Sequence, residues 1–597
     1  MSRHLPTLAL GLIGVTLWVW PVAWTLWSDE CFTAGLADRT FSGAIHGVEQ
    51  DRHPPAYFLL VWAAAHLAKS DAALRLVSAA AVLVAWGITT DAARRHLRPA
   101  GALAASAWFA GSCVPALFAH TLRPYALALA AGAGLLWGAL ESIHPDNTRA
   151  RRGAVALAVA GLLAFWSHYA AVLVGVAAFA VALVGAARSG QARSRLPLPL
   201  GAGVAVVLGC LPWLLGPFGV QFSERNPRGA VAWEVLNYLF WGPDTSVPAW
   251  GVVAAGLTAL GVLALAFAPV PPGSRELRRA APIVALLMIV LPLVASTNVP
   301  ARELRNYIGF FPAATLFAGA AFEAALSPVP ERLRSAAAVV LALLVVGPAS
   351  VQMVRAPTHP QDLEAGHDYR VEAEVLDRLI PSSATVRFQP DYVVKQYDRY
   401  VPALGARAVR GPADWQLFTT GGDADACLIL YAFRVRVQPP EADCAATWAA
   451  LEAEAERTGY PGLLHARAMR AVDEGRAEAA AVDLARLQAL PQRWPSTALL
   501  AARIAEARGD KTAVEAALTE AVRLARAFEP PGRQTAGLWR KLAAARRKLG
   551  DTAGADAAAA ASECAAERDP AWACGGPLAW ATRPTERRER KIEADRP

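Results

Sequence analysis

The sequence has 597 residues, of which 55% are hydrophobic, and a formal net charge of +8. A soluble chain does not need so many long apolar runs, so most of this chain is predicted to lie in a membrane. The arginines fall in short loops between apolar runs and in a helical tail, without the interleaved aromatic residues of a nucleic-acid-binding surface. We therefore expect membrane lipids, and no nucleic acid, as partners.

Apolar runs near the length that crosses a bilayer, about 20 residues, follow one another from Leu5 to Met353. The first run, from Leu5 to Trp27, lacks a small-residue cleavage site and is predicted to remain as an anchor. We predict an α-helical polytopic membrane protein with about 11 to 13 transmembrane helices. The crossings are expected near residues 5–27, 73–90, 100–119, 124–141, 153–168, 170–186, 198–216, 248–268, 281–296, 307–326 and 336–353.

Arginines are concentrated in alternate gaps between these runs, at 94–98, 149–152, 188–195, 275–279 and 332–334. The positive-inside rule places such gaps in the cytoplasm, together with the N-terminus. The C-terminal region then lies outside a bacterial inner membrane. The apolar segment 53–68 is short, and a full crossing there would invert the charge pattern, so it is interpreted as re-entrant or interfacial.

The composition divides the chain into a transmembrane domain at 1–355 and three further parts. Residues 356–445 mix helix-like and strand-like stretches and are predicted to form a small extracytoplasmic α/β module. Residues 446–576 are helical in pattern, with Gly475 and Gly509 34 residues apart, as in tetratricopeptide-like (TPR-like) repeats that bind protein partners. An irregular helical bundle is the alternative. Residues 577–597 are expected to be disordered.

The predicted outer loop between residues 28 and 52 is the part of the chain richest in candidate catalytic and binding residues. Asp29 and Glu30 follow the first crossing, and Asp51, Arg52 and His53 precede the next apolar segment. Sugar transfer from a polyprenyl phosphate needs a carboxylate base and cations near the phosphate, because the leaving group is already a stable anion. The loop offers both kinds of group, although carboxylates next to a crossing are often merely solvated.

Three further outer helix ends carry ionisable residues beside tyrosines. They are Arg123 with Tyr125, His168 with Tyr169, and Arg305 with Tyr307. Ionisable groups at membrane depth are costly unless they serve a site. The alternative is that each group snorkels from its helix end beside an interfacial tyrosine. We expect these residues to contribute to a site on the outer face.

The order of these motifs resembles the GT-C superfamily of membrane glycosyltransferases. The matching features are the anchor followed by Trp27-x-Asp-Glu, the sequence Asp51-x-His-Pro-Pro-x-Tyr57, and Leu74-Arg-Leu at the next segment. More narrowly, the chain resembles the protein O-mannosyltransferase and aminoarabinose-transferase branch, which includes glycosyltransferase family 39. The resemblance extends over about residues 1 to 350 and leaves the helical tail unmatched.

The resemblance implies an inverting transferase that moves a sugar from a polyprenyl-phosphate-linked donor to a glycan, lipid or protein acceptor at the periplasmic face. It implies that Asp29 is the catalytic carboxylate, with Glu30 beside it, and that Asp51 and His53, together with Arg123 and Arg305, bind metal or the donor phosphate. We expect the neighbouring side chains to bind donor phosphate or substrate as well, namely Arg52, Tyr125, His168 and Tyr307. A divalent ion such as Mg, Mn or Zn would lie at Asp51 and His53. Asn306 departs from the family, which usually has an arginine directly before the tyrosine.

Two other functions compete with this interpretation. A lipid or polysaccharide transporter would also have many crossings, but it would be expected to show internal repeats and charges near mid-membrane. A non-enzymatic platform for the helical tail would need only one anchor helix. The concentration of charged and aromatic residues at one face favours the enzyme.

Overall fold

The computed structural model describes residues 5–19, 26, 28–49, 53–189, 192–214, 248–267, 275–295, 304–354, 369–389, 394–418, 428–430, 435–438, 444–490, 494–528 and 533–566. The chain divides into two compact units. The first comprises Met1–Pro243, Ala249–His359 and Val393–Gly405. The second comprises Asp244–Pro248, Pro360–Tyr392 and Ala406–Pro597.

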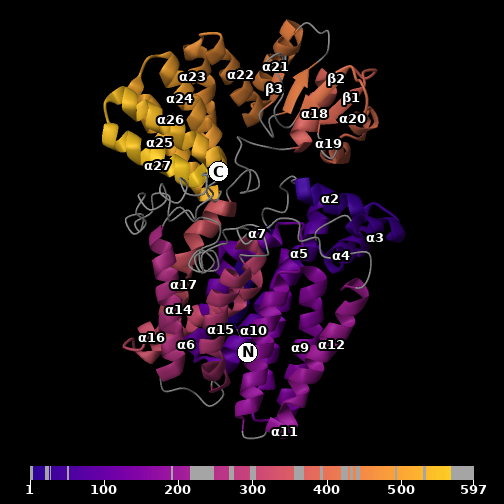
Figure 1. The fold of residues 1–597 in the computed structure, drawn as a ribbon, viewed down its shortest axis with the longest axis vertical. Helices are drawn as coiled ribbons and strands as arrows, with labels where there is room; N and C mark the ends of the chain where they lie inside the picture. The colour runs from indigo at the N-terminus through magenta and orange to yellow at the C-terminus, as the bar shows by residue number, and fades with distance from the viewer. Residues whose placement is uncertain are drawn as a thin grey trace, which may run out of the picture. The chain divides into compact units, whose positions relative to one another are not determined.

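The first unit is built from helices (Figure 1). In chain order they are α1 (Leu5–Val19), α2 (Ser28–Ala37), α3 (Phe41–Glu49), α4 (Ala56–Ala65), α5 (Asp71–His96), α6 (Pro99–Gly111), α7 (Cys113–Ala119), α8 (Tyr125–Ser142), α9 (Asn147–Ser167), α10 (Ala171–Arg188), α11 (Ala192–Arg195), α12 (Pro197–Leu214), α14 (Pro248–Phe267), α15 (Arg275–Ala295), the 3-10 helix η2 (Leu304–Phe310), α16 (Phe311–Ala325) and α17 (Glu331–Val354). Each predicted crossing overlaps one or two of these helices.

Among the described residues, 6 helices are long and apolar enough to cross a membrane, or 7 if α6 and α7, bent by 46°, form one span. The structure therefore shows a polytopic helical membrane protein, while the larger predicted number of crossings stays a prediction. Helix α4 has 10 residues, which gives it a length of about 15 Å, roughly half a hydrocarbon core. This length agrees with the interfacial or re-entrant interpretation of 53–68.

Small residues let the membrane helices approach closely. A Cβ on Gly153 of α9 would lie 2.2 Å from the backbone nitrogen of Ser142, and one on Gly138 of α8 would lie 2.8 Å from the backbone nitrogen of Leu157. Membrane helices associate by such backbone packing, since lipid supplies no hydrophobic force between them. These contacts join the end of α8 to the start of α9, and the antiparallel pair then brings the start of α8 beside the end of α9, at the candidate site.

The second unit contains a four-stranded mixed sheet in the order β1-β2-β4-β3. Strand β1 (Val386–Gln389) pairs in parallel with β2 (Trp415–Phe418). Strand β4 (Val435–Gln438) is antiparallel to β2 and to β3 (Leu428–Leu430). Helix α18 (Tyr369–Leu379) precedes the sheet. Helices α19 (Val394–Tyr400) and α20 (Pro402–Ala406) lie between β1 and β2 in the chain, yet Val393–Gly405 belongs to the first unit.

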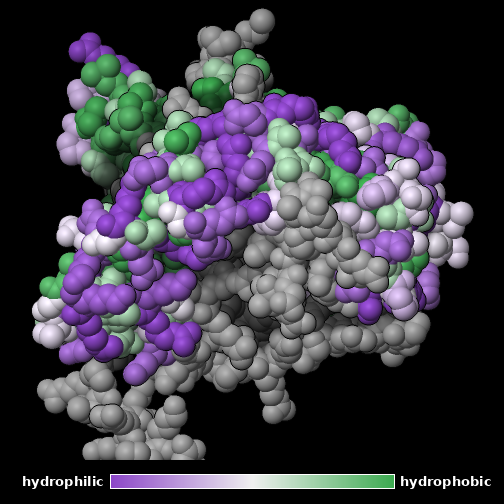
Figure 2. Space-filling model, turned by 90° about the horizontal axis from the view of Figure 1, so that it is seen from above, coloured by the Kyte–Doolittle hydropathy of each residue, from purple (hydrophilic) through white to green (hydrophobic). Residues whose placement is uncertain are grey.

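The helical tail consists of antiparallel helices. They are α21 (Cys444–Thr458), α22 (Pro461–Asp473), α23 (Ala477–Gln488), α24 (Pro495–Ala507), α25 (Lys511–Phe528), α26 (Arg533–Leu549) and α27 (Thr552–Ala566). Gly475, Gly509 and Gly550 turn the chain with φ of 75°, 73° and 83°, a conformation that suits glycine. Hydrophilic residues predominate among those coloured in Figure 2. The TPR-like classification stays a prediction, and residues 577–597 lie outside the described residues.

Candidate active site

The first turn of α2 is fixed by a buried ion pair. Arg75 of α5 donates from Nε to Oε1 of Glu30 at 3.1 Å and from Nη2 to Oε2 at 2.6 Å. Both side chains have no exposed surface. The backbone N–H of Leu122 also donates to Oε1 at 2.5 Å. Removing one partner of such a pair costs about 3–5 kcal/mol, because the other charge stays buried.

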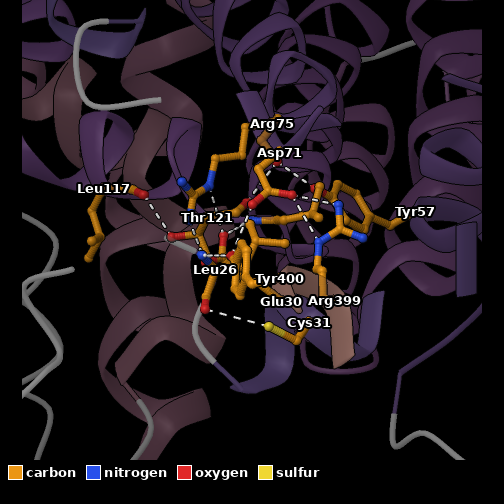
Figure 3. Close-up of polar contacts among 12 residues, drawn as sticks. Leu26, Glu30, Cys31, Tyr57, Asp71, Arg75, Leu117, Thr121, Arg399 and Tyr400 are labelled. Atoms are coloured by element: carbon orange, nitrogen blue, oxygen red, sulfur yellow. Dashed lines mark hydrogen bonds and ion pairs between the residues drawn. The ribbon is translucent and has the colours of Figure 1, made fainter. Parts of the chain in front are cut away.

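A second set of hydrogen bonds ties α4 and α5 to the turn before α8 (Figure 3). The hydroxyls of Tyr57 and Ser78 are 2.6 Å apart, and Ser78 donates to the backbone carbonyl of Thr121 at 2.8 Å. The Thr121 hydroxyl donates to the carbonyl of Leu117 at 2.8 Å. These bonds satisfy buried polar groups of α4, α5, α7 and the turn itself, so they hold the turn 120–124 in one position.

Four of the predicted site residues meet at this turn. His53 precedes α4, Arg123 and Tyr125 lie at the start of α8, and His168 caps the end of α9. The His53 ring lies 5.1 Å from the His168 ring and 6.1 Å from the Tyr125 ring, measured between centroids. The Tyr125 and His168 rings are 5.3 Å apart. Residues separated by more than a hundred positions therefore form one aromatic and cationic cluster.

The hydrogen bonds of the cluster define its tautomers. Arg123 donates from Nη2 to Nδ1 of His53 at 3.0 Å, and the backbone N–H of Ala170 donates to Nδ1 of His168 at 3.2 Å. Because both Nδ1 atoms accept, each neutral ring carries its proton on Nε2. Arg123 is 4% exposed, and Cζ of its guanidinium lies 5.9 Å from the centre of the Phe58 ring. The site thus offers a cation and two imidazole N–H groups to an anion.

The residues at His53 fit a metal poorly at Nδ1. The Arg123 guanidinium occupies that nitrogen, and a second cation there would be repelled. Among the residues that the structure describes, no group of three His, Cys, Asp or Glu side chains is placed to hold a metal ion. Asp51, the other predicted ligand, lies outside the described residues.

The remaining predicted residues are described only in part. Asp29 lies in the first turn of α2, and Arg305 lies in η2, but the positions of their side chains are not described. Arg52 lies outside the described residues, as Asp51 does. Tyr307 is 1% exposed in η2, which packs against α8 and α10, and its hydroxyl has no hydrogen-bond partner within the described ranges.

Sequence reasoning missed the partners of α2. Arg75 had a usable signal, because an arginine inside an apolar run needs a counter-ion. Asp71, Arg399 and Tyr400 had none, since they lie in polar surroundings where charges are ordinary. In the structure, Arg399 and Tyr400 of α19 bind Asp71, at the start of α5, and Tyr400 also accepts from the backbone of Leu26 (Figure 3).

Comparisons with known proteins agree with this architecture. Residues 52–215 match the family model described as dolichyl-phosphate-mannose-protein mannosyltransferase. Apo ArnT from Cupriavidus metallidurans has a TM-score of 0.50 and 15% identity, covering 73% of this chain and 98% of that chain. ArnT from the same organism bound to undecaprenyl phosphate has a TM-score of 0.48 and 16% identity, covering 73% of this chain and 98% of that chain. An Archaeoglobus fulgidus oligosaccharyltransferase tethered with an acceptor peptide has a TM-score of 0.39 and 11% identity, covering 68% of this chain and 63% of that chain.

No curated protein sequence matches the chain significantly. The family match includes His53, Arg123 and His168, so the cluster lies inside the matched segment. The fold shared with ArnT extends over 73% of the chain. The resemblance that the motifs predicted is confirmed: the chain is a membrane glycosyltransferase whose residues 52–215 match the mannosyltransferase family model and whose fold is similar to that of ArnT.

Proposed function

We propose that the chain transfers a sugar from a polyprenyl-phosphate-linked donor to an acceptor hydroxyl or amide of a glycan, lipid or protein, at the periplasmic face of a bacterial inner membrane. The matched family is described by a dolichyl-phosphate-linked donor, which is a polyprenyl phosphate. Phosphate is also the ligand that an arginine and two imidazole N–H groups would recognise. Donor chemistry and cluster chemistry therefore agree.

The observation that carries the proposal is a hydrogen bond that joins α2 to the turn next to the cluster. The Leu122 N–H donates to Glu30, and Leu122 directly precedes Arg123. Asp29 is next to Glu30 in the first turn of α2. This bond brings the backbone of Asp29, the proposed base, and Arg123, the proposed cation for the phosphate, to the same end of the helices. Donor and acceptor would have to meet there.

The proposed reaction is a single displacement. The acceptor oxygen or nitrogen attacks the anomeric carbon and loses its proton to Asp29, while the bond from that carbon to the phosphate oxygen breaks. The electron pair leaves with the polyprenyl phosphate, whose charge Arg123 and the Nε2–H groups of His53 and His168 stabilise. One displacement inverts the anomeric configuration. We assign Glu30 a positioning role, because both its carboxylate oxygens are engaged.

The test uses membranes that contain the full chain and a panel of radiolabelled polyprenyl-phosphate sugars. Wild type is expected to release polyprenyl phosphate and to label an acceptor with the opposite anomeric configuration, as read by NMR of the product. Asp29→Asn is expected to lower turnover by about a thousandfold with an unchanged donor KM, because it removes the base but not the phosphate site.

The matched control is Asp510→Asn in the helical tail, where the side chain accepts from the N–H of Ala513. An asparagine keeps that cap, so turnover should stay at the wild-type level. If wild type binds the donors but never cleaves the sugar–phosphate bond, the transferase proposal fails and a lipid transporter takes its place. A chelator arm reports whether a divalent ion is needed.

A further inference from the structure

Helix α19 and the residues after it, 394–405, form a segment that is separated from the membrane helices in sequence but belongs to the same unit. This 394–405 segment lies in the chain between strands β1 and β2. Helix α19 packs directly against α2. Tyr397 of this helix has no exposed surface, so α19 has a buried face.

Tyr400 links the approach to α2 with the start of α5. Its hydroxyl accepts from the backbone N–H of Leu26 at 2.8 Å and donates to Oδ2 of Asp71 at 2.9 Å (Figure 3). Burial, the largest cause, raises the pKa of this hydroxyl, so it keeps the proton that it donates. Leu26 comes three residues before Asp29 in the chain. The bond therefore anchors the backbone that leads into the first turn of α2.

Arg399 secures the other end of α2. It donates from Nε and Nη2 to Oδ1 of Asp71, at 2.9 Å and 2.5 Å, and from Nη1 to Oδ2 of Asp38 at 3.4 Å. Asp38 directly follows the last residue of α2. Between the two ends, Nζ of Lys395 lies 5.5 Å from the centre of the Phe32 ring. The segment thus contacts α2 before its start, along its length and after its end.

The two faces of α2 are held in different ways. On one side Glu30 is locked to Arg75 and Leu122, a contact within the membrane helices. On the other side Leu26 and Asp38 are linked to Asp71 of α5 through Tyr400 and Arg399. A charge-assisted bond to a partly buried carboxylate is strong and directional. Such bonds hold a short helix that has too few residues to be stable alone.

We infer that Tyr400 and Arg399 are positioning residues for sugar transfer: by holding both ends of α2, the 394–405 segment sets the place of Asp29. The inference rests on the proposed function, in which Asp29 is the base. A base must lie within hydrogen-bond reach of the proton that it takes, and small displacements are costly to the rate. The bonds of Tyr400 and Arg399 to Leu26, Asp71 and Asp38 involve none of the proposed phosphate-binding residues, so donor binding is expected not to depend on these bonds.

The test is Tyr400→Phe in the full chain, which keeps the ring and removes both hydrogen bonds. Turnover is expected to fall by about 10- to 100-fold, as a displacement of about 1 Å would cause. The donor KM is expected to stay within about twofold of wild type, because the phosphate site is untouched. The KM and kcat are measured per mole of folded protein, after size-exclusion chromatography in detergent.

The matched control is Tyr460→Phe in the second unit. That hydroxyl also donates to a buried carboxylate, Oε1 of Glu372, at 3.4 Å. A tyrosine–carboxylate bond of the same kind is lost there, so turnover should match wild type. Tyr400→Phe combined with Asp71→Ala tests the linkage: the loss of turnover in the double variant should be smaller than the product of the two single losses, because both variants remove the same bond between Tyr400 and Asp71.

Three outcomes overturn the inference. The first is wild-type turnover in Tyr400→Phe, and the second is a rise in donor KM that matches the loss of kcat/KM. The third is an equal loss in Tyr460→Phe. If Tyr400→Phe does not accumulate, Asp38→Asn makes the same test, since it weakens one exposed contact of Arg399 and should lower turnover severalfold at constant KM. Absence of transfer by wild type would instead overturn the proposed function.

Discussion

Glu30 and Arg75 form a bidentate ion pair in which neither side chain has any exposed surface. The pair joins α2 to α5 across 45 residues of sequence, and the Leu122 N–H adds a third bond to the same carboxylate. Two adjacent carboxylates therefore have different tasks. Glu30 belongs to the framework, and Asp29 remains the residue proposed to take the proton.

Glu30→Gln should destabilise the membrane unit by about 3–5 kcal/mol, because the Arg75 charge would stay buried without its counter-ion. The double variant Glu30→Gln with Arg75→Met should regain at least half of that loss. It buries no net charge, and the glutamine oxygen can still accept from Leu122. Thermal unfolding in detergent measures both effects. A single variant as stable as wild type would show that the pair is not buried as described.

Arg123→Gln should raise the donor KM by about 10- to 100-fold, because the variant loses a buried cation next to the donor phosphate. The reach of the side chain is nearly kept, so folding should not suffer. Steady-state kinetics with varied donor concentration measure the effect. Arg508→Gln is the control, since Arg508 binds a carboxylate, Glu478, in the helical tail. An equal donor KM in both variants would show that Arg123 does not bind the donor phosphate.

Gly132→Ala should disturb η2. A Cβ on Gly132 of α8 would lie 2.2 Å from the carbonyl oxygen of Gly309, so the backbone of η2 must move. Overpacking of this kind costs about 1–3 kcal/mol, and here it also displaces Tyr307. Gly87→Ala in α5 is the control, because nothing lies within 4 Å of its added Cβ. The melting temperature and the transfer rate of the two variants give the comparison.

His465 should make the helical tail sensitive to acid. Burial lowers its pKa from 6.5 to about 4, and its Nε2 lies 3.2 Å from the carbonyl oxygen of Ser496. Below pH 6.5 His465 is protonated in the unfolded chain but stays neutral in the folded chain. The free energy of unfolding therefore falls as the pH drops from 6.5 toward 4. Above 6.5 this contribution is constant.

The expected loss between about pH 7 and about pH 5 is roughly 2 kcal/mol. Hydrogen exchange of peptides from α22 and α24 in the full chain, corrected for the intrinsic pH dependence of exchange, measures it. His465→Gln should remove this part of the pH dependence, because an amide does not titrate. The same slope in wild type and variant would show that other groups are responsible.

The cluster of His53, Arg123, Tyr125 and His168 could be predicted from the sequence because each residue stands at the end of an apolar run. Ionisable and aromatic groups at such ends share one depth in the membrane, so helices that cross together bring them to one level. Which of them touch depends on the order in which the helices pack. The structure supplied that order through the close crossing of α8 and α9.

Membrane insertion, the positions of the helices and the residue types of the candidate site were determined by the sequence alone, because the length and hydropathy of each run decide whether it can lie in lipid. Only the tertiary structure distinguished the role of Glu30 from that of Asp29, since the buried counter-ion of Glu30, Arg75, is brought to it by packing. It alone joined Tyr400 to Leu26, which are 374 positions apart. Contacts at that separation leave no local pattern, because they arise when whole helices meet rather than from neighbours in the chain.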